Sequence, residues 1–332
     1  MLCLLDWLQG RWSWPPLESD PAVFLALARD LLIGGGAAAD GSGQALPPLQ
    51  QELLGSLPPL PHFGEVLSFD EDGPNALCES RALLVCFHSA PSGRPGLHPA
   101  QAAAAAASAA DAGGQVFFIR QVPGLDAACG IIALLHALLN AGLLGAPGGT
   151  VAGHWPEGGP MRRWLEALPP SASPADRGRA LVNDVGIRAI YRTHATGGQS
   201  RMPLSPIWTW VTLLPALAWV VSAAWVLFAR GTKVLSIYLC FSLACLLVCA
   251  LIWRLSGGRC PSKLECHFVC LAEREGRLLL LDGLQDSAKD LGACEGAFAR
   301  SALEFVRGSL LPALSRPDTC AIVAVSEAEA FS

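Results

Sequence analysis

Charged residues are scarce in this sequence. They make up 15% of its 332 residues, and the formal net charge at pH 7 is only −5. The chain has no basic stripe that could meet a phosphate backbone, which argues against nucleic acid as the main partner. A mild negative charge suits a basic partner instead. The mean hydropathy of +0.40 is high for a soluble protein.

Signals for export and for zinc are also missing. The opening "MLCLLDWLQGRW" lacks a basic start, and Asp6 interrupts its short apolar run, so we expect no signal peptide. A cytoplasmic protein with reduced cysteines is therefore expected. Cys266 and Cys270 flank His267, but no second pair of ligands follows at zinc-finger spacing. We expect neither a metal nor a cofactor.

Two long uncharged runs interrupt the soluble pattern within an insertion at 201–262. Residues 202–229 and 234–253 contain no charged side chain, and only "RGTK" separates them. A bilayer core needs about 20 apolar residues, so transmembrane helices at 206–229 and 234–253 would form a hairpin that anchors the protein to a membrane. A translated intron is the alternative, because pyrimidine-rich tracts encode the same Leu, Phe, Cys, Ser and Val.

Apolar periodicity and turn residues divide the rest of the chain into short elements. Ser19 or Asp20 can cap an opening helix, with Pro21 in its first turn. Strands are expected at 82–90, 115–122 and 319–328, a helix at about 129–140, and two helices within 160–184, the second of them capped by Ser173.

The segment 267–283 predicts a β-hairpin, because "HFVCLA" and "RLLLLDG" are strand-like and enclose the turn "EREG". A symmetric turn centred between Arg274 and Glu275 places His267 directly opposite Asp282, with Cβ atoms about 4.5–5.5 Å apart. A carboxylate in that place can orient an imidazole for catalysis. Polar residues also commonly end strands, so the pair alone leaves both interpretations open.

Cys129 begins an apolar helix after a Pro/Gly loop. A helix N-terminus stabilises a thiolate, which is the nucleophilic form of cysteine. Gly130 would let a substrate backbone approach, and the side-chain amide of Gln121 could donate to an oxyanion. His267 would be the base, whereas His136, two turns along the helix, is interpreted as a packing histidine. The alternative for Cys129 is a buried core thiol.

The order Gln, Cys-Gly, His and Asp, with fifteen steps from His267 to Asp282, resembles the ubiquitin carboxyl-terminal hydrolases, in particular their short single-domain members. These are cysteine proteases with a papain-like catalytic arrangement. Several other stretches are similar to family elements in the same order: "RWSWPPLESDP", "FGEVLSFD", "RALLVCFHSA", "QVFFIRQV", "CGIIALLHALLN", "SPADRGRALVND" and "TCAIVAVSEA".

This resemblance implies a role for each candidate residue. Cys129 would be the nucleophile, His267 the general base and acid, Asp282 the residue that orients His267, and Gln121 the oxyanion donor. The reaction would be thiol-dependent deubiquitination, the hydrolysis of amide, ester or thioester bonds after the last glycine of ubiquitin. The partner would be ubiquitin or a ubiquitin-like protein, and the enzyme would be a monomer.

The resemblance also implies a mixed α/β (α+β) fold, with a central antiparallel sheet of about six strands flanked by helices. Residues 1–200 and 263–332 would form one catalytic domain, and 201–262 would occupy the place of the family's crossover loop. The loop "QVPGLDAAC" carries two residues more than is usual between Gln121 and Cys129. An impaired, ubiquitin-binding pseudoenzyme and a membrane-tethered hydrolase are therefore alternatives.

Overall fold

The computed structural model describes ten stretches of the chain. These are residues 14–34, 60–66, 79–88, 103–104, 110–111, 116–125, 127–142, 158–197, 266–314 and 317–327. By its contacts the chain divides into two units, Met1–Arg201 with Leu264–Ser332, and Met202–Lys263. The insertion predicted at 201–262 lies outside the described residues. Within the described stretches, no helix is both long and apolar enough to cross a membrane.

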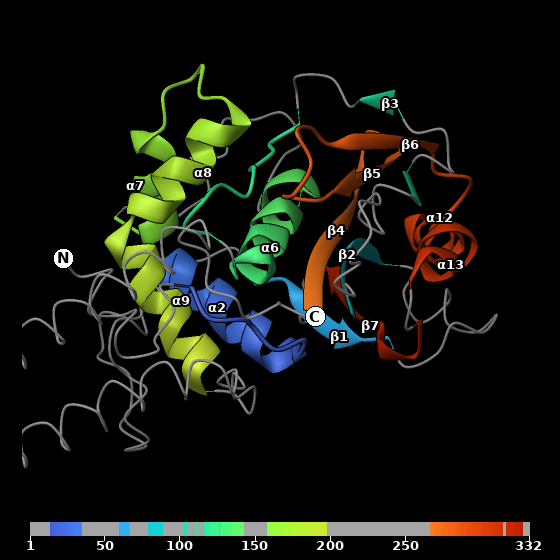
Figure 1. The fold of residues 1–332 in the computed structure, drawn as a ribbon, viewed down its shortest axis with the longest axis horizontal. Helices are drawn as coiled ribbons and strands as arrows, with labels where there is room; N and C mark the ends of the chain where they lie inside the picture. The colour runs from blue at the N-terminus through green and yellow to red at the C-terminus, as the bar shows by residue number, and fades with distance from the viewer. Residues whose placement is uncertain are drawn as a thin grey trace, which may run out of the picture. The chain divides into compact units, whose positions relative to one another are not determined.

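One antiparallel sheet organises the described part of the chain (Figure 1). Its strand order is β1-β7-β2-β4-β5-β6-β3. Six of the strands have four residues or more and β3 has two, which confirms the predicted sheet of about six strands. The strands are β1 (His62–Glu65), β2 (Ser80–His88), β3 (Ala110–Asp111), β4 (Cys266–Arg274), β5 (Arg277–Leu281), β6 (Lys289–Ala293) and β7 (Ala321–Ser326).

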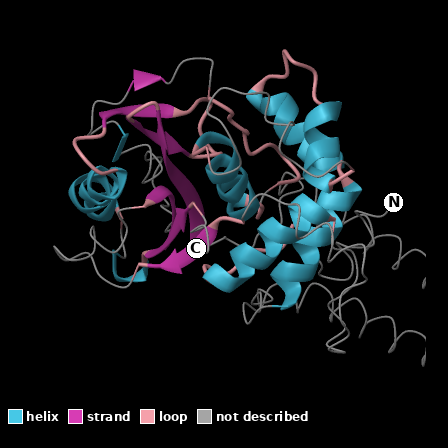
Figure 2. Cartoon of the chain, turned by 180° about the vertical axis from the view of Figure 1, so that it is seen from behind, coloured by secondary structure: helices cyan, strands magenta, loops and turns pink. Residues whose placement is uncertain are grey.

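Helices pack on both faces of this sheet (Figure 2). On one face lie α2 (Pro21–Ile33), α6 (Cys129–Asn140), α7 (Pro160–Ala167), α8 (Pro174–Asn183) and α9 (Val185–Gly197). On the other face lie α12 (Phe298–Phe305) and α13 (Leu311–Ala313), joined by a π-helical turn at Val306–Leu310, and a 3-10 turn follows at Pro317–Thr319. The helices predicted near 129–140 and within 160–184 are confirmed.

The two middle strands supply both hydrophobic cores. Leu84 of β2 and Cys270 of β4 face the core around α6, whereas Val85 and Val269, one residue away on each strand, face the core around α12. Successive side chains of a strand point to opposite faces, so a strand covered by helices on both sides is apolar throughout. Every residue of α6 is buried, which makes it the central helix of its layer.

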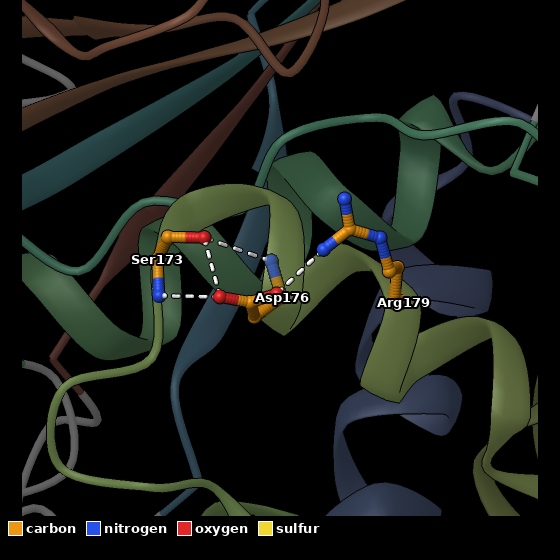
Figure 3. Close-up of polar contacts among 3 residues, drawn as sticks. All are labelled: Ser173, Asp176 and Arg179. Atoms are coloured by element: carbon orange, nitrogen blue, oxygen red, sulfur yellow. Dashed lines mark hydrogen bonds and ion pairs between the residues drawn. The ribbon is translucent and has the colours of Figure 1, made fainter.

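Short polar caps begin two of the helices. Asp20 accepts a hydrogen bond from the Ala22 N–H at 2.8 Å, with Pro21 at the first position of α2. Ser173 caps α8 as predicted, in a reciprocal box with Asp176 (Figure 3). The Ser173 N–H donates to Asp176 at 3.2 Å, and the same carboxylate binds Arg179 at 2.5 Å. Each cap satisfies N–H groups that the first turn leaves unpaired.

The strand predicted at 115–122 is wrong, because residues 116–122 belong to no strand of the sheet. The Arg120 N–H donates to the carbonyl of Pro174 at 3.0 Å, and the Gln121 N–H donates to the carbonyl of Gly283 at 2.7 Å. These partners belong to a helix and a loop, not to a neighbouring strand. The segment therefore has strand-like composition without a strand's neighbour.

We predict that Gly178→Ala destabilises the protein. A Cβ atom at Gly178 would lie 2.2 Å from the carbonyl oxygen of Arg120, a backbone atom that cannot move aside. We expect overpacking to lower the free energy of unfolding by about 1–3 kcal/mol, measured by urea denaturation. Gly308→Ala is the control, because its Cβ would meet nothing within 4 Å. An unchanged midpoint for Gly178→Ala would contradict this packing.

Candidate active site

His267 and Asp282 form a buried pair. His267 lies at the start of β4 and Asp282 directly follows β5. The two side chains are 6% and 0% exposed, and His267 Nε2 lies 2.8 Å from Asp282 Oδ1. The same Oδ1 accepts the N–H of Leu284 at 3.0 Å, which fixes the carboxylate. The predicted proximity of His267 and Asp282 is confirmed.

The predicted register of this hairpin is wrong by two residues. Arg274 pairs with Arg277, so the turn consists of Glu275 and Gly276, which have φ angles of 53° and 71°. Two consecutive positive φ angles give a tight turn whose twist matches that of the strands. His267 and Asp282 are therefore diagonal and not directly opposite. A two-residue shift leaves the alternation of faces unchanged, so their side chains still meet.

Cys129 is the first residue of α6 and is 6% exposed. Its thiol lies near enough to His267 to interact with the imidazole and to contribute to raising its pKa. No side chain caps this helix, so the N–H groups of its first turn lie beside the thiol. Because Asp282 occupies Nε2 of the imidazole, Nδ1 is the nitrogen left to face the thiol. A cysteine, a histidine and an aspartate thus come together from three separate elements.

The environment of His267 favours its protonated form. Burial lowers the pKa of the imidazole, but the charge and hydrogen bond of Asp282, together with the contact to Cys129, outweigh burial and raise the pKa to about 10. A neighbouring carboxylate stabilises an imidazolium, and removal from water strengthens that attraction. A protonated imidazole beside a cysteine can in turn stabilise a thiolate.

The loop from Gln121 to Cys129 contains a β-turn. The Leu125 N–H donates to the carbonyl of Val122 at 3.0 Å, with Pro123 and Gly124 between them. Gly124 has a φ of 100°, as a type II turn requires at that position. Gln121 Nε2 donates to the carbonyl of Leu125 at 2.8 Å, which holds the amide of Gln121 over the turn.

His136 packs in the core beside this cluster, near enough to the carbonyl of Leu281 and the charge of Asp282 for both to act on its pKa. It is fully buried, its ring stacks on Phe118 with centroids 5.0 Å apart, and Nε2 accepts the N–H of Ile119 at 2.9 Å. Burial lowers the pKa of His136 to about 4, so its imidazole is neutral near pH 7. These contacts are those of a packing histidine. In the described stretches no group of three or more His, Cys, Asp or Glu could hold a metal ion.

The sequence interpretation missed the contribution of the N-terminal segment. The Tyr191 hydroxyl donates to the carbonyl of Pro15 at 2.5 Å and lies 3.4 Å from the carbonyl of Ala127, just before Cys129. A Cβ at Gly130 would lie 2.9 Å from Leu17, so Gly130 makes room for the chain itself and not for a substrate. The sequence signal for a structural role of Tyr191 is the rarity of tyrosine, since the chain contains two tyrosines.

We predict that Asp282→Asn lowers the pKa of His267, because loss of the carboxylate charge leaves burial to favour the neutral ring. The folded pKa of about 10 exceeds the ordinary value of 6.5. Protonated His267 therefore stabilises the fold below pH 6.5, and this contribution is lost as the pH rises through 10. Nitrogen NMR of the imidazole and urea denaturation across this range measure both effects.

Asp286→Asn is the matched control for that substitution. Asp286 is a nearby acid, but its side chain is 83% exposed and pairs with Arg120. We expect this variant to keep the pKa of His267 at its original value. An Asp282→Asn protein with an unchanged His267 pKa would contradict the pairing in the structure.

Comparison with known proteins places this geometry in a family. The model of ubiquitin carboxyl-terminal hydrolase, family 1, matches residues 47–309. The fold is similar to the UCH37 catalytic domain of Trichinella spiralis bound to ubiquitin vinyl methyl ester, with 14% identity and a TM-score of 0.51 over 95% of this chain and 96% of that one.

A second structure of Trichinella spiralis UCH37 bound to ubiquitin vinyl methyl ester gives 15% identity and a TM-score of 0.50, over 96% of this chain and 83% of that one. The search of curated protein sequences returns no match. At these identities the solved structures establish the fold, whereas the family model covers most of the chain. The protein belongs to the ubiquitin carboxyl-terminal hydrolase family of cysteine-type enzymes.

Proposed function

We propose that this protein hydrolyses the bond after the C-terminal glycine of ubiquitin through a triad of Cys129, His267 and Asp282. The single observation that carries the proposal is the buried contact between His267 and Asp282 at 2.8 Å, with Cys129 within reach of the same imidazole. A nucleophile, a base and a group that orients the base are the parts that acyl transfer needs.

The proposed reaction has two halves. The Cys129 thiolate attacks the carbonyl of the terminal glycine, and His267 gives its proton to the leaving amine as the C–N bond breaks. His267 then takes a proton from water, which attacks the thioester and releases ubiquitin. Asp282 remains bound to Nε2 throughout, which keeps Nδ1 directed at the reacting groups. An ester or thioester would follow the same course with a different leaving group.

We propose that Gln121 stabilises the oxyanion of each tetrahedral intermediate. A primary amide carries two N–H groups, and the hydrogen bond to the Leu125 carbonyl holds this amide in place. The same carbonyl accepts the N–H of Ala128 at 2.9 Å, one residue before Cys129. The amide of Gln121 and the residue before the nucleophile thus bind the same carbonyl oxygen. A fixed donor stabilises developing charge without reorganising, and one such donor contributes about 100-fold or more to kcat.

Ubiquitin is the substrate that the family and the charge of the protein favour. The similar UCH37 structures hold ubiquitin vinyl methyl ester, a ubiquitin with an electrophilic C-terminus. The net charge of −5 on this chain suits the basic C-terminal tail of ubiquitin. The proposal includes a ubiquitin-like protein with the same glycine-ended tail, since the triad acts on the bond that follows this tail.

We predict that ubiquitin vinyl methyl ester labels Cys129 covalently. The thiolate adds to the vinyl group, so the mass of the protein should rise by that of one ubiquitin. Cys129→Ala should abolish labelling, whereas Cys294→Ala, which lies after β6, should be labelled like the unaltered protein. Intact mass spectrometry measures both. Labelling that persists in Cys129→Ala would refute the assignment, and ubiquitin binding without labelling or turnover would indicate a pseudoenzyme.

We further propose that 201–262 is an insertion into a single catalytic domain formed by 1–200 and 263–332. All four proposed site residues lie outside it. We expect a protein with a short Gly/Ser linker in place of 201–262 to react with the ubiquitin probe at a rate within about threefold of the full chain, because the elements that hold the site groups are all retained. Flotation of the full chain with vesicles tests the membrane hairpin. A folded deletion protein that no longer reacts would contradict this separation.

A further inference from the structure

The segment that carries Gln121 is held by side chains where a strand would be held by a neighbouring strand. Asn140 binds both backbone groups of Phe117: Oδ1 accepts the Phe117 N–H at 2.8 Å, and Nδ2 donates to the Phe117 carbonyl at 2.8 Å. This is the pair of bonds that a residue in an antiparallel sheet exchanges with its partner. A single asparagine of α6 replaces that partner.

His136 continues the same pattern two residues along the segment. Its Nε2 accepts the N–H of Ile119 at 2.9 Å, and its backbone carbonyl accepts a bond from Asn140 Nδ2 at 2.9 Å. His136 and Asn140 are one helical turn apart, so they lie on one face of α6. A neutral imidazole offers a lone pair to the Ile119 N–H, and burial keeps His136 neutral.

The opposite edge of the segment is bound by α8. Arg177 donates to the carbonyl of Phe118 at 3.1 Å, and its guanidinium lies 4.4 Å from the centre of the Phe117 ring. The backbone groups of Phe117 and Ile119 bind α6, whereas the backbone carbonyl of Phe118 binds α8. This alternation from one residue to the next is that of a strand. Three side chains therefore hold the backbone before Arg120, and the bonds of the Arg120 and Gln121 N–H groups to the carbonyls of Pro174 and Gly283 hold the rest.

We propose that His136 and Asn140 are positioning residues that set the amide of Gln121 relative to Cys129. All three of Cys129, His136 and Asn140 belong to the 12-residue helix α6. The nucleophile and the clamp on the oxyanion segment are thus parts of one rigid element, and Gln121 follows only two residues after Ile119. This inference rests on the proposed role of Gln121.

A double-mutant cycle separates positioning from a merely structural role. His136→Phe keeps a ring against Phe118 but removes the acceptor for the Ile119 N–H, whereas His136→Gln returns an acceptor through Oε1. We expect His136→Phe to lower kcat on a fluorogenic ubiquitin amide by about tenfold, since small misplacements of a catalytic group are costly. KM should stay within about twofold, and His136→Gln should recover most of the lost kcat.

The same substitution in a Gln121→Ala background gives the decisive comparison. If His136 acts through Gln121, His136→Phe should lower kcat by less than about twofold once Gln121 is gone. An equal tenfold loss in both backgrounds would overturn this inference and leave the proposed function standing. A Gln121→Ala protein with unchanged kcat would refute the oxyanion role itself, and the inference with it.

Arg177→Met provides a second route should His136→Phe not fold. It removes the bond to the Phe118 carbonyl and the guanidinium over the Phe117 ring but keeps an unbranched side chain, so it tests the other edge of the segment. The expected pattern is the same: Arg177→Met lowers kcat, and this loss disappears in the Gln121→Ala background. Arg179→Ala is the control and should leave kcat unchanged. The exposed side chain of Arg179 binds Asp176, the cap residue of α8, as Figure 3 shows.

Discussion

The buried bond between His267 and Asp282 is the interaction on which the proposed chemistry depends. Both side chains are almost fully removed from water, and burying a charged group is costly unless a partner compensates it. Pairing β4 with β5 supplies that partner by bringing together residues fifteen apart in the chain. The Leu284 N–H then fixes the carboxylate. The sheet therefore determines the position and the charge of the imidazole before any substrate arrives.

Helix α6 connects this pair to the rest of the site. It begins with Cys129 beside His267, and its last turn holds the extended segment that leads to Gln121. The loop between them closes through the carbonyl of Leu125, which binds the side chain of Gln121 and the backbone of Ala128. Because α6 is buried along its whole length, shifts of one proposed catalytic group relative to another would require the core to move.

Local pattern predicted much of this arrangement. Alternating apolar residues and a turn predicted the hairpin that joins His267 to Asp282, and the position of Cys129 before an apolar run predicted its helix. The register was missed because the turn places Glu275 at a positive φ, which non-glycine residues rarely adopt. The composition of 115–122 predicts a strand, but in the structure Asn140 and Arg177, distant in sequence, make the bonds that a neighbouring strand would make.

The turn before Cys129 had a local signal in the sequence, whereas the contact between Tyr191 and Pro15 had none. Pro123 and Gly124 are the residues that a type II turn favours, and the loop before Cys129 contains that turn. The contact of Tyr191 with Pro15 joins residues 176 apart, which no local pattern encodes. Sequence patterns thus predicted many of the elements, and the family resemblance added the roles of the proposed site residues, whereas the bonds between distant segments required the fold.

The most direct measurement is a single turnover of a ubiquitin amide, stopped by acid within milliseconds and analysed by mass. The account predicts a transient adduct of one ubiquitin, which hydroxylamine cleaves as it does thioesters and which maps to the peptide that contains Cys129. Product that forms with no such adduct, or an adduct on a different cysteine, would contradict the proposed nucleophile and the mechanism built on it.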